Sequence, residues 1–282
     1  MSVAQQQAQY PPLEAKSPFE LRGTWSSTVS DDEVRAALAS GEMGFLHSFT
    51  TGSAVDGPGV RVVAWTTGCQ FRCLYCHNPD TWTLNKGIPV TIERANTELR
   101  KYRHGLRTMC GGFTLSGGEP LMQDRFAVRL LGAAHEMGIH TALDSNGSLG
   151  HRLSDQDLNV IDLVLLDIKS WDPDVHRRLT GMELEPVLEF ARRLAAARRP
   201  VWLRYVLVPS LTDNLGDIAQ LAEFAADLGN VERVDVLPFH QMGRFKWKEL
   251  HLDYKLDEVS PPSAELVSIV IDQFRSRGLK AY

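Results

Sequence analysis

Cysteine is the residue type that carries the clearest chemistry in this sequence. Three of the four cysteines form the run Cys69-x3-Cys73-x2-Cys76, and Cys110 stands alone. Thiolates this close together can bind one metal centre. A structural zinc ion takes four protein ligands, so a zinc site would also need Cys110 or His77. A [4Fe–4S] cluster with three thiolate ligands leaves one iron open to a small molecule; we favour this hypothesis and keep zinc as the alternative.

The elements that position these cysteines follow an alternating pattern of strands and helices. Short apolar segments rich in β-branched residues predict strands at 60–66, 112–115, 139–143, 161–168, 201–208 and 231–237. Amphipathic segments between them predict helices at 91–102, 123–137, 186–197 and 214–228. Strands that alternate with helices form a parallel sheet with right-handed crossovers. The pattern alone leaves open whether the sheet is an open one or is curled into a barrel.

Polar and reactive residues gather just after the predicted strands. Since the carboxyl ends of parallel strands meet at one edge of a sheet, the residues that follow them should share a cleft. In chain order these residues are Cys69, Gly117–Gly118–Glu119, Asp144–Ser145–Asn146, Asp167, Lys169, Pro209–Ser210 and His240. We therefore expect one active site at the carboxyl end of the sheet.

Length, composition and charge limit the remaining possibilities. The chain has 282 residues and a net charge of −5, which argues against nucleic acid as the main partner because phosphate binding relies on basic patches. Its apolar runs are too short to span a membrane. No secretory signal is visible, so we expect a cytoplasmic protein without disulfides. The polar residues 1–42 are expected to form a partly disordered extension ahead of a core domain of residues 43–282.

The longer motifs around these positions are more specific than the cysteine spacing. The string CQFRCLYCHNPDTW follows DGPG at residues 56–59, and the motifs YRHG, LSGGEP, DSNG, LLDIK, RYVLVP and LPFHQMG occur after it in that order. The cysteine run after a first strand resembles the radical S-adenosylmethionine (SAM) superfamily. The complete set resembles its glycyl-radical-enzyme activating enzymes, in particular those that act on pyruvate formate-lyase. The resemblance implies an α/β fold, namely a partial (β/α)6 barrel of parallel strands with outer helices.

The resemblance also implies a radical reaction at a single [4Fe–4S] cluster. Cys69, Cys73 and Cys76 would hold three irons, and the amino and carboxylate groups of SAM would chelate the fourth. Reductive cleavage of SAM would give methionine and a 5′-deoxyadenosyl radical, which abstracts a Cα hydrogen from one glycine of the partner enzyme. The cofactors carry this chemistry, so no residue is assigned as a catalytic acid or base. Cys110 is expected to be a bystander.

The same resemblance implies a set of SAM-binding residues. Gly117, Gly118 and Glu119 would border the methionine moiety, although this short sequence alone is typical of a turn. Strand alternation places Asp167 and Lys169 on one face, where they would hold the ammonium and carboxylate of SAM; a surface ion pair is the alternative. Five further residues would contact SAM, mainly around its adenosine; the alternative is that they only pack the cysteine loop. These are Tyr75, Cys76, His77, Ile168 and His240.

Polar residues are also implied at the mouth of the barrel, where a loop of the partner would enter. Asp56, His77 and Arg204 would bind that loop; a turn at Asp56 and a salt bridge at Arg204 are the alternatives. Asp144 resembles a ligand of a monovalent cation near SAM, although Ser145 stands where the resembled enzymes have threonine. The cation is therefore an additional expected cofactor beside the cluster and SAM.

The cysteine count limits the type of activating enzyme. Activating enzymes with an inserted ferredoxin-like domain need about eight further cysteines, and this chain has one to spare. The resemblance therefore implies the short, single-cluster type, which takes electrons from an external flavodoxin or ferredoxin, and we expect a monomer. A radical SAM enzyme that acts on a small molecule and a zinc-stabilised binding module are the alternative functions.

Overall fold

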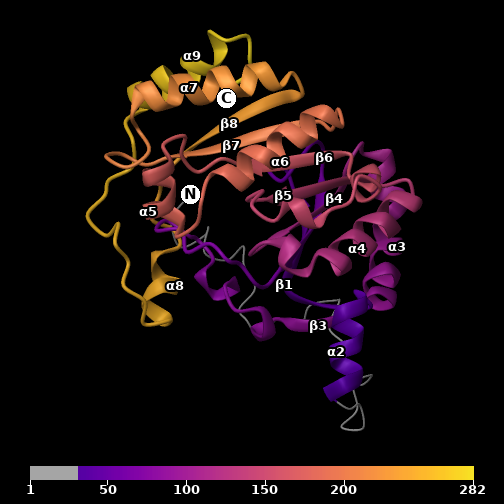
Figure 1. The fold of residues 1–282 in the computed structure, drawn as a ribbon. Helices are drawn as coiled ribbons and strands as arrows, with labels where there is room; N and C mark the ends of the chain where they lie inside the picture. Colours follow the sequence, from indigo (N-terminus) through magenta and orange to yellow (C-terminus); the bar gives the residue numbers. More distant parts are fainter. Residues whose placement is uncertain (1–30) are drawn as a thin grey trace.

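One sheet of eight strands organises the molecule. The structure, a computed structural model, describes residues 31–282, so the disorder predicted for residues 1–30 lies outside the described residues. The strand order is β3-β1-β2-β4-β5-β6-β7-β8 (Figure 1). The strands are β1 Met43–Ser53, β2 Arg61–Thr66, β3 Ile88–Thr91, β4 Gly112–Gly117, β5 His140–Ser145, β6 Leu163–Asp167, β7 Val201–Leu207 and β8 Val231–Pro238.

Six of these strands are parallel neighbours, from β2 through β4, β5, β6 and β7 to β8. They coincide with the six predicted strands, which confirms the partial (β/α)6 barrel. The antiparallel strands β1 and β3 extend the sheet beyond β2, and neither was predicted. Within residues 31–282 the edge strands β3 and β8 do not pair with each other, so the barrel is open between them.

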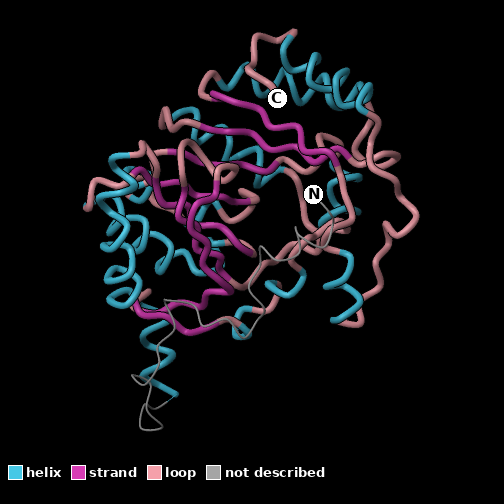
Figure 2. The backbone as a smooth tube through the Cα atoms, turned by 180° about the vertical axis from the view of Figure 1, so that it is seen from behind, coloured by secondary structure: helices cyan, strands magenta, loops and turns pink. Residues whose placement is uncertain are grey.

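The helices lie around the sheet and pack mainly against one of its faces. Four of them, α3, α4, α6 and α7, correspond to the predicted helices. In Figure 1, α3 and α4 lie together at the right, whereas α7 and α9 lie beyond β8 at the top; Figure 2 shows the strands from behind. No helix among the described residues is both long and apolar enough to cross a membrane. The bounds are α2 Asp31–Ser40, α3 Ile92–Thr108, α4 Asp124–Glu136, α5 Pro173–Thr180, α6 Glu185–Ala196, α7 Leu215–Leu228, α8 Arg244–Glu249 and α9 Ala264–Arg275.

The two faces of the sheet differ in polarity. On β7, Leu203 and Tyr205 are buried in the main hydrophobic core with the helices, so by alternation Trp202 and Arg204 lie on the inner face. Near the start of the strands the inner face is apolar, because a separate small cluster packs against Trp202. Its members are Ala142, Leu163 and Leu165. Nearer the carboxyl ends the inner face is charged, and this is where the predicted site residues lie.

Candidate active site at the carboxyl ends of the strands

The loop of residues 68–78 follows β2 and carries the three neighbouring cysteines. Its backbone is held on two sides. The amide of Gly68 donates to the carbonyl of Thr81, in the 3-10 turn Pro79–Thr81, over 2.7 Å, and the amide of Leu74 donates to Leu179 of α5 over 3.0 Å. The buried side chain of Phe71 anchors the loop in the main core. The position of this cluster loop is therefore set by three separate elements.

The three thiols of the cluster loop are free and partly buried. Burial raises the pKa of Cys73 to about 12 and also raises the pKa of Cys69 and Cys76. The ammonium of Lys169 offsets part of this effect at Cys73 and Cys76. Thiols in such an environment stay protonated unless a metal centre stabilises the thiolate. The donor set therefore fits a metal–thiolate group.

A closed zinc site does not form around these thiols. Within residues 31–282, no three side chains of His, Cys, Asp or Glu converge as ligands of one ion, whereas structural zinc needs four. Cys110 is exposed and lies in the turn between α3 and β4, where its carbonyl oxygen abuts Gly59. His77 stacks on His240 at a centroid distance of 4.3 Å. Neither Cys110 nor His77 therefore completes a zinc site with the three thiols. An iron–sulfur cluster binds each thiolate through a different iron, so it suits thiols that do not converge on one ion.

Asp167 and Lys169 lie together at the end of β6. The Nζ atom of Lys169 is 2.8 Å from Oδ2 of Asp167 and 5.7 Å from the ring centre of Tyr75. Burial disfavours the charge of Lys169, but Asp167 and the neighbouring tyrosine and cysteine hold its pKa well above its ordinary value. Ile168 between them is buried in the main core. The pair presents one cation and one anion side by side, which is the complement of a zwitterionic amino acid.

The two glycines at the end of β4 allow this strand to run close to the cluster loop. A Cβ atom on Gly117, which has φ +122°, would lie 2.2 Å from the amide nitrogen of Thr66. A Cβ atom on Gly118 would lie 2.4 Å from the carbonyl oxygen of Gly68. Only glycine fits such an approach. The glycine backbone is thus brought beside the loop that holds Cys69.

Glu119 is fully buried and joins two loops instead of facing an open site. Its carboxylate accepts hydrogen bonds from the amides of Leu121 (3.0 Å) and Asn146 (2.8 Å) and from the hydroxyl of Ser145 (2.9 Å). Burial raises the pKa of Glu119 to about 7. Because the carboxylate is already occupied, the backbone carbonyls of Gly117 and Gly118 are the better acceptors for a ligand ammonium.

Arg204 connects three polar parts of the inner face. Its Nη1 atom lies 3.1 Å from Oδ2 of Asp144, and its Nη2 atom donates to the carbonyl of Val55 over 2.8 Å. The same Nη2 atom is 3.7 Å from Oδ1 of Asp56, and Ser116 donates to Asp144 over 2.6 Å. Burial raises the pKa of Asp144 even though Arg204 is adjacent. The structure thus brings the predicted cation ligand and two predicted partner-binding residues into one network.

The two predicted histidines, His77 in the cluster loop and His240 after β8, form a neutral pair. The rings of His77 and His240 are stacked, with 28° between their planes, and Nε2 of His77 lies 3.1 Å from the carbonyl oxygen of His240. Burial lowers the pKa of His77 to about 4 and lowers that of His240 as well. Both rings are therefore uncharged near pH 7. They offer a flat surface and hydrogen-bonding nitrogens, but not a positive charge.

The arrangement of the cysteines and charged residues described above agrees with the family to which similar proteins belong. The profile of the radical SAM superfamily matches residues 63–225. The pyruvate formate-lyase 1-activating enzyme of Escherichia coli (strain K12) is 42% identical over 230 residues, which cover 81% of this chain and 94% of that enzyme. The chain belongs to the pyruvate formate-lyase-activating enzymes of the radical SAM superfamily.

Two further activating enzymes support this membership. The pyruvate formate-lyase-activating enzyme of Staphylococcus epidermidis is 42% identical over 231 residues, with 79% of this chain and 92% of that enzyme covered. A crystal structure of a domain of pyruvate-formate lyase-activating enzyme from Bacteroides vulgatus superimposes with a TM-score of 0.52 and 30% identity, covering 61% of this chain and 98% of that domain. Membership in the radical SAM superfamily implies a [4Fe–4S] cluster and SAM as cofactors, and the three partly buried thiols suit the cluster.

The short helix α8 of this activating enzyme contacts the cluster loop, and the sequence analysis missed it. The indole Nε1 of Trp247 donates to the carbonyl of Cys76 over 2.7 Å. Lys246 pairs with Asp80, directly after the cluster loop, over 2.8 Å. Trp247 also packs edge-on against Trp82 at a centroid distance of 5.2 Å. No sequence signal links residues this far apart in the chain, so only the fold reveals the contact.

Asn146 is a second residue of the site that was given no role in the sequence analysis. It lies in the DSNG turn after β5 and is buried. Its Nδ2 atom is 3.9 Å from Sγ of Cys69 and donates a hydrogen bond to it. The DSNG motif was recognised in the sequence, but the direction of this side chain follows only from the packing of two loops.

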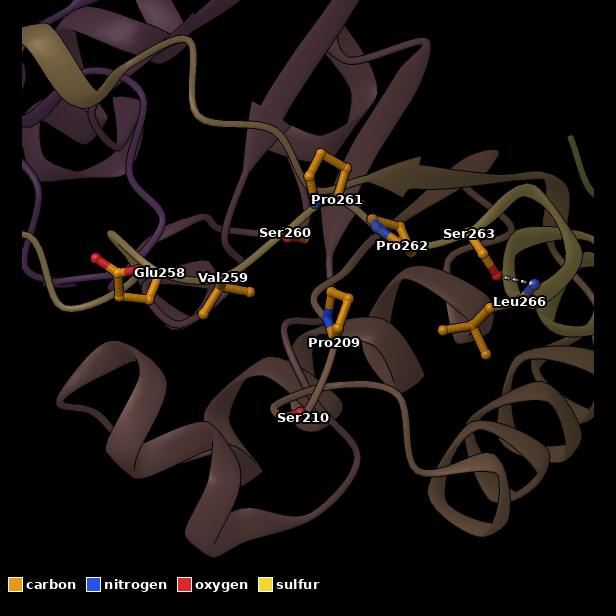
Figure 3. Close-up of a pocket in the computed structure, with 9 residues that line it drawn as sticks. All are labelled: Pro209, Ser210, Glu258, Val259, Ser260, Pro261, Pro262, Ser263 and Leu266. Atoms are coloured by element: carbon orange, nitrogen blue, oxygen red, sulfur yellow. Dashed lines mark hydrogen bonds between the residues drawn. The ribbon is translucent and has the colours of Figure 1, made fainter.

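Two cavities of the activating enzyme lie away from these residues. One cavity of about 370 Å³ lies between the loop after β7 and the segment that leads into α9 (Figure 3). Its lining contains a single titratable side chain, Glu258. A second cavity of about 490 Å³ lies at the starts of β7 and β8, beside Trp202 and Arg233. The first cavity is lined in part by Pro209 and Ser210, which were expected in the cleft, so the structure separates these two from the other predicted site residues. Neither cavity includes a residue assigned to the cluster, SAM or the partner, so the cluster loop and the charged inner face define the candidate site.

Proposed function

We propose that this chain activates pyruvate formate-lyase, or a closely related glycyl radical enzyme, by abstracting a Cα hydrogen from one of its glycines. Three desolvated thiols beside the charged inner face of an open barrel carry this proposal, in a chain that belongs to the activating enzymes. When bound, the [4Fe–4S] cluster and SAM supply the one-electron chemistry that generates the 5′-deoxyadenosyl radical. The protein binds, orients and shields the reactants.

Cys69, Cys73 and Cys76 would hold the cluster in this proposal. At the methionine end of SAM, Asp167 would accept from the ammonium and Lys169 would pair with the carboxylate, as their adjacent opposite charges support. The backbone carbonyls at the end of β4 would also accept from the ammonium. The residues proposed around these groups and the adenosine are Tyr75, Cys76, His77, Gly117, Gly118, Ile168 and His240, with Glu119 holding the adjoining loops together.

Asp56, His77 and Arg204 would receive the glycine loop of the partner. A guanidinium can donate to backbone carbonyls, and a carboxylate can accept from backbone amides. Arg204 already donates to one backbone carbonyl, that of Val55, which supports this role. Asp144 is proposed as the ligand of a monovalent cation because its position in the DSNG motif matches the cation ligand of the resembled enzymes. In the structure its carboxylate accepts from Ser116 and Arg204. We further propose flavodoxin or ferredoxin as electron donor, a monomeric state and a cytoplasmic location.

The deciding experiment is an anaerobic activation assay. Purified protein should be brown and contain about four irons per chain. With a reductant, SAM and pyruvate formate-lyase it should generate a glycyl EPR doublet and oxygen-sensitive cleavage of the partner. SAM cleavage without this doublet would favour action on a small molecule, and a colourless protein with bound zinc would contradict both radical functions.

A matched pair of cysteine variants tests the ligand assignment in the same assay. We expect Cys73→Ser to abolish SAM cleavage, because it removes one of three thiolates. Cys110→Ser should keep the full iron content and activity, because this thiol is exposed and lies in the turn after α3. Loss of iron from the Cys110 variant would contradict the three-ligand cluster.

A further inference from the structure

Asn146 contacts a predicted cluster ligand from a different loop. Its amide Nδ2 lies 3.9 Å from Sγ of Cys69, although the two residues are 77 positions apart in the chain. The backbone amide of Asn146 donates to Oε2 of Glu119 over 2.8 Å, which fixes the turn that carries it. Both the backbone and the side chain of Asn146 are therefore held in place beside the cluster loop.

The hydrogen-bond partners of Asn146 determine which end of its amide faces the sulfur. The Oδ1 atom accepts from the amide of Ser148 (3.1 Å), from the hydroxyl of Ser148 (3.0 Å) and from Nε2 of Gln70 (3.1 Å). Rotating the amide by 180° would point its NH2 group at these donors and its oxygen at the sulfur. Such an arrangement would leave buried polar groups unpaired, which is costly. The N–H group must therefore face Cys69.

We propose that Asn146 is a positioning residue that donates a hydrogen bond to the Cys69 thiolate and so raises the reduction potential of the cluster. The inference rests on the proposed function, because it requires Cys69 to be a cluster ligand. Hydrogen bonds to the sulfurs are one of the means by which proteins set the potential of an iron–sulfur cluster. The reduced cluster carries one more negative charge than the oxidised cluster, so the N–H dipole stabilises the reduced form more.

The electron balance is simple. One electron passes from an external one-electron donor to the oxidised [4Fe–4S]2+ cluster, and the donor is oxidised by one electron. The hydrogen bond from Asn146 makes this transfer more favourable and makes the reduced cluster a slightly weaker reductant toward SAM. Its role is thus to ease reduction of the cluster by the donor.

The test compares the midpoint potential of the [4Fe–4S]2+/1+ couple in three proteins, measured by EPR-monitored redox titration without SAM or partner. Asn146→Leu has a similar volume and no donor, and we expect its equilibrium constant for reduction to fall about tenfold, or 59 mV for one electron. Asn146→Asp is nearly isosteric, keeps the acceptor and loses the donor, so its potential should also fall. Ser148→Ala removes one of the three donors to Oδ1 and leaves the Nδ2 group in place; its potential should match the wild type.

Each outcome separates this inference from the proposed function. A wild-type protein that forms no cluster would contradict the proposed function itself. A wild-type cluster whose potential is unchanged in both Asn146 variants would overturn only the inference. Failure of both Asn146 variants to hold a cluster, while Ser148→Ala holds one, would overturn it too, because Asn146 would then be needed to build the site. Lower potentials in both variants beside an unchanged Ser148→Ala would support it.

Discussion

At the scale of single residues, Arg204 links several functional parts. Its guanidinium contacts Asp144 and the carbonyl of Val55 at once and lies near Asp56. A planar group with several donors can serve these partners together, whereas the single ammonium of lysine cannot. Arg204 therefore connects the loop expected to meet the partner with the carboxylate expected to bind a cation.

We expect Arg204→Lys to separate partner activation from SAM cleavage. Glycyl radical formation should fall about tenfold or more, because lysine cannot reproduce the forked contacts. Uncoupled SAM cleavage by the dithionite-reduced enzyme should stay within about twofold, since the proposed contacts to the methionine end are intact. Spin quantitation of the glycyl radical and chromatography of 5′-deoxyadenosine measure the two rates. An equal loss of both would show that Arg204 acts on SAM binding.

Glu119 makes the stability of the folded protein depend on pH. Its pKa is about 7 in the folded chain and 4.5 ordinarily, so the folded state binds the proton more tightly than the unfolded state. The resulting stabilisation is complete below pH 4.5 and is lost as the pH rises through 7. Glu119→Gln cannot titrate. The stability advantage of the wild type over this variant should thus shrink by about 1 kcal/mol between pH 6 and pH 8.

Urea unfolding of both proteins at the two pH values measures this difference. The comparison with Glu119→Gln removes the contribution of every other titrating group. If the difference is the same at pH 6 and pH 8, then the hydrogen bonds from Leu121, Ser145 and Asn146 keep Glu119 ionised despite its burial.

The sequence alone predicts some residues of this site and not others. Spacing alone singles out the three cysteines, and two-residue alternation places Asp167 and Lys169 on one face, where they lie 2.8 Å apart. The carboxylate of Glu119 could not be oriented in the same way, because its partners come from another loop. Asn146 has no periodic or compositional signal for a bond to a sulfur atom. Contacts between loops depend on tertiary packing, which a single sequence does not encode locally.

At the scale of secondary structure, α8 is a small element with a large effect on the site. It has six residues, too few for a helix that is stable in isolation. Its Trp247 is 5% exposed and its indole bonds to the carbonyl of Cys76. Phe245, on the same helix, is 50% exposed. Trp247 and Lys246 therefore anchor the helix beside the cluster loop, whereas Phe245 is open to solvent.

We expect Trp247→Phe to loosen the cluster loop. The variant leaves the carbonyl of Cys76 without its donor and removes part of the contact with Trp82, at a cost of about 1–3 kcal/mol. The absorbance of the cluster should therefore decay faster in the presence of an iron chelator. Phe245→Ala is the matched control and should decay like the wild type. Equal rates in all three proteins would show that α8 does not hold the cluster loop.

The elements that were predicted correctly are those in which the apolar residues are continuous or recur at a regular spacing. The six parallel strands are short, continuous and apolar, and α4 has a regular apolar stripe that is buried. Strand β1 was missed because two irregularities in its pairing with β2, at Leu46/Ser48 and at Thr51/Ser53, interrupt its two-residue alternation. Helix α5 was also missed, although signals mark both of its ends: Asp172 is the N-cap, Pro173 lies in the first turn and Gly181 follows the end.

At the scale of the whole molecule, β1 marks where the barrel begins. Helix α2 precedes it and lies against α4. Arg125 of α4 donates to the carbonyl of Ala39 in α2 over 2.8 Å, and Arg129 of α4 pairs with Glu42, just after α2, over 2.6 Å in an exposed position. Exposed ion pairs contribute little to stability. We propose that α2 lies outside the core domain, which would begin at residue 43.

We expect a shortened chain that begins at residue 41 to remain folded and active. Its Tm should stay within about 4 °C of the full chain, and its iron content and glycyl radical yield should be unchanged. Calorimetry and the activation assay provide these values. A loss of cluster or a much larger fall in Tm would show that residues 1–40 belong to the core domain.

The contact between Trp247 and Cys76 has a consequence for how the enzyme is made. The two residues are 171 positions apart, so at roughly 5–20 residues per second a ribosome needs roughly 10–30 s to reach α8 after the cysteines. Throughout this interval the carbonyl of Cys76 lacks the donor that Trp247 later supplies. The cluster loop therefore gains this anchoring contact only late in synthesis, after most of the sheet has been made.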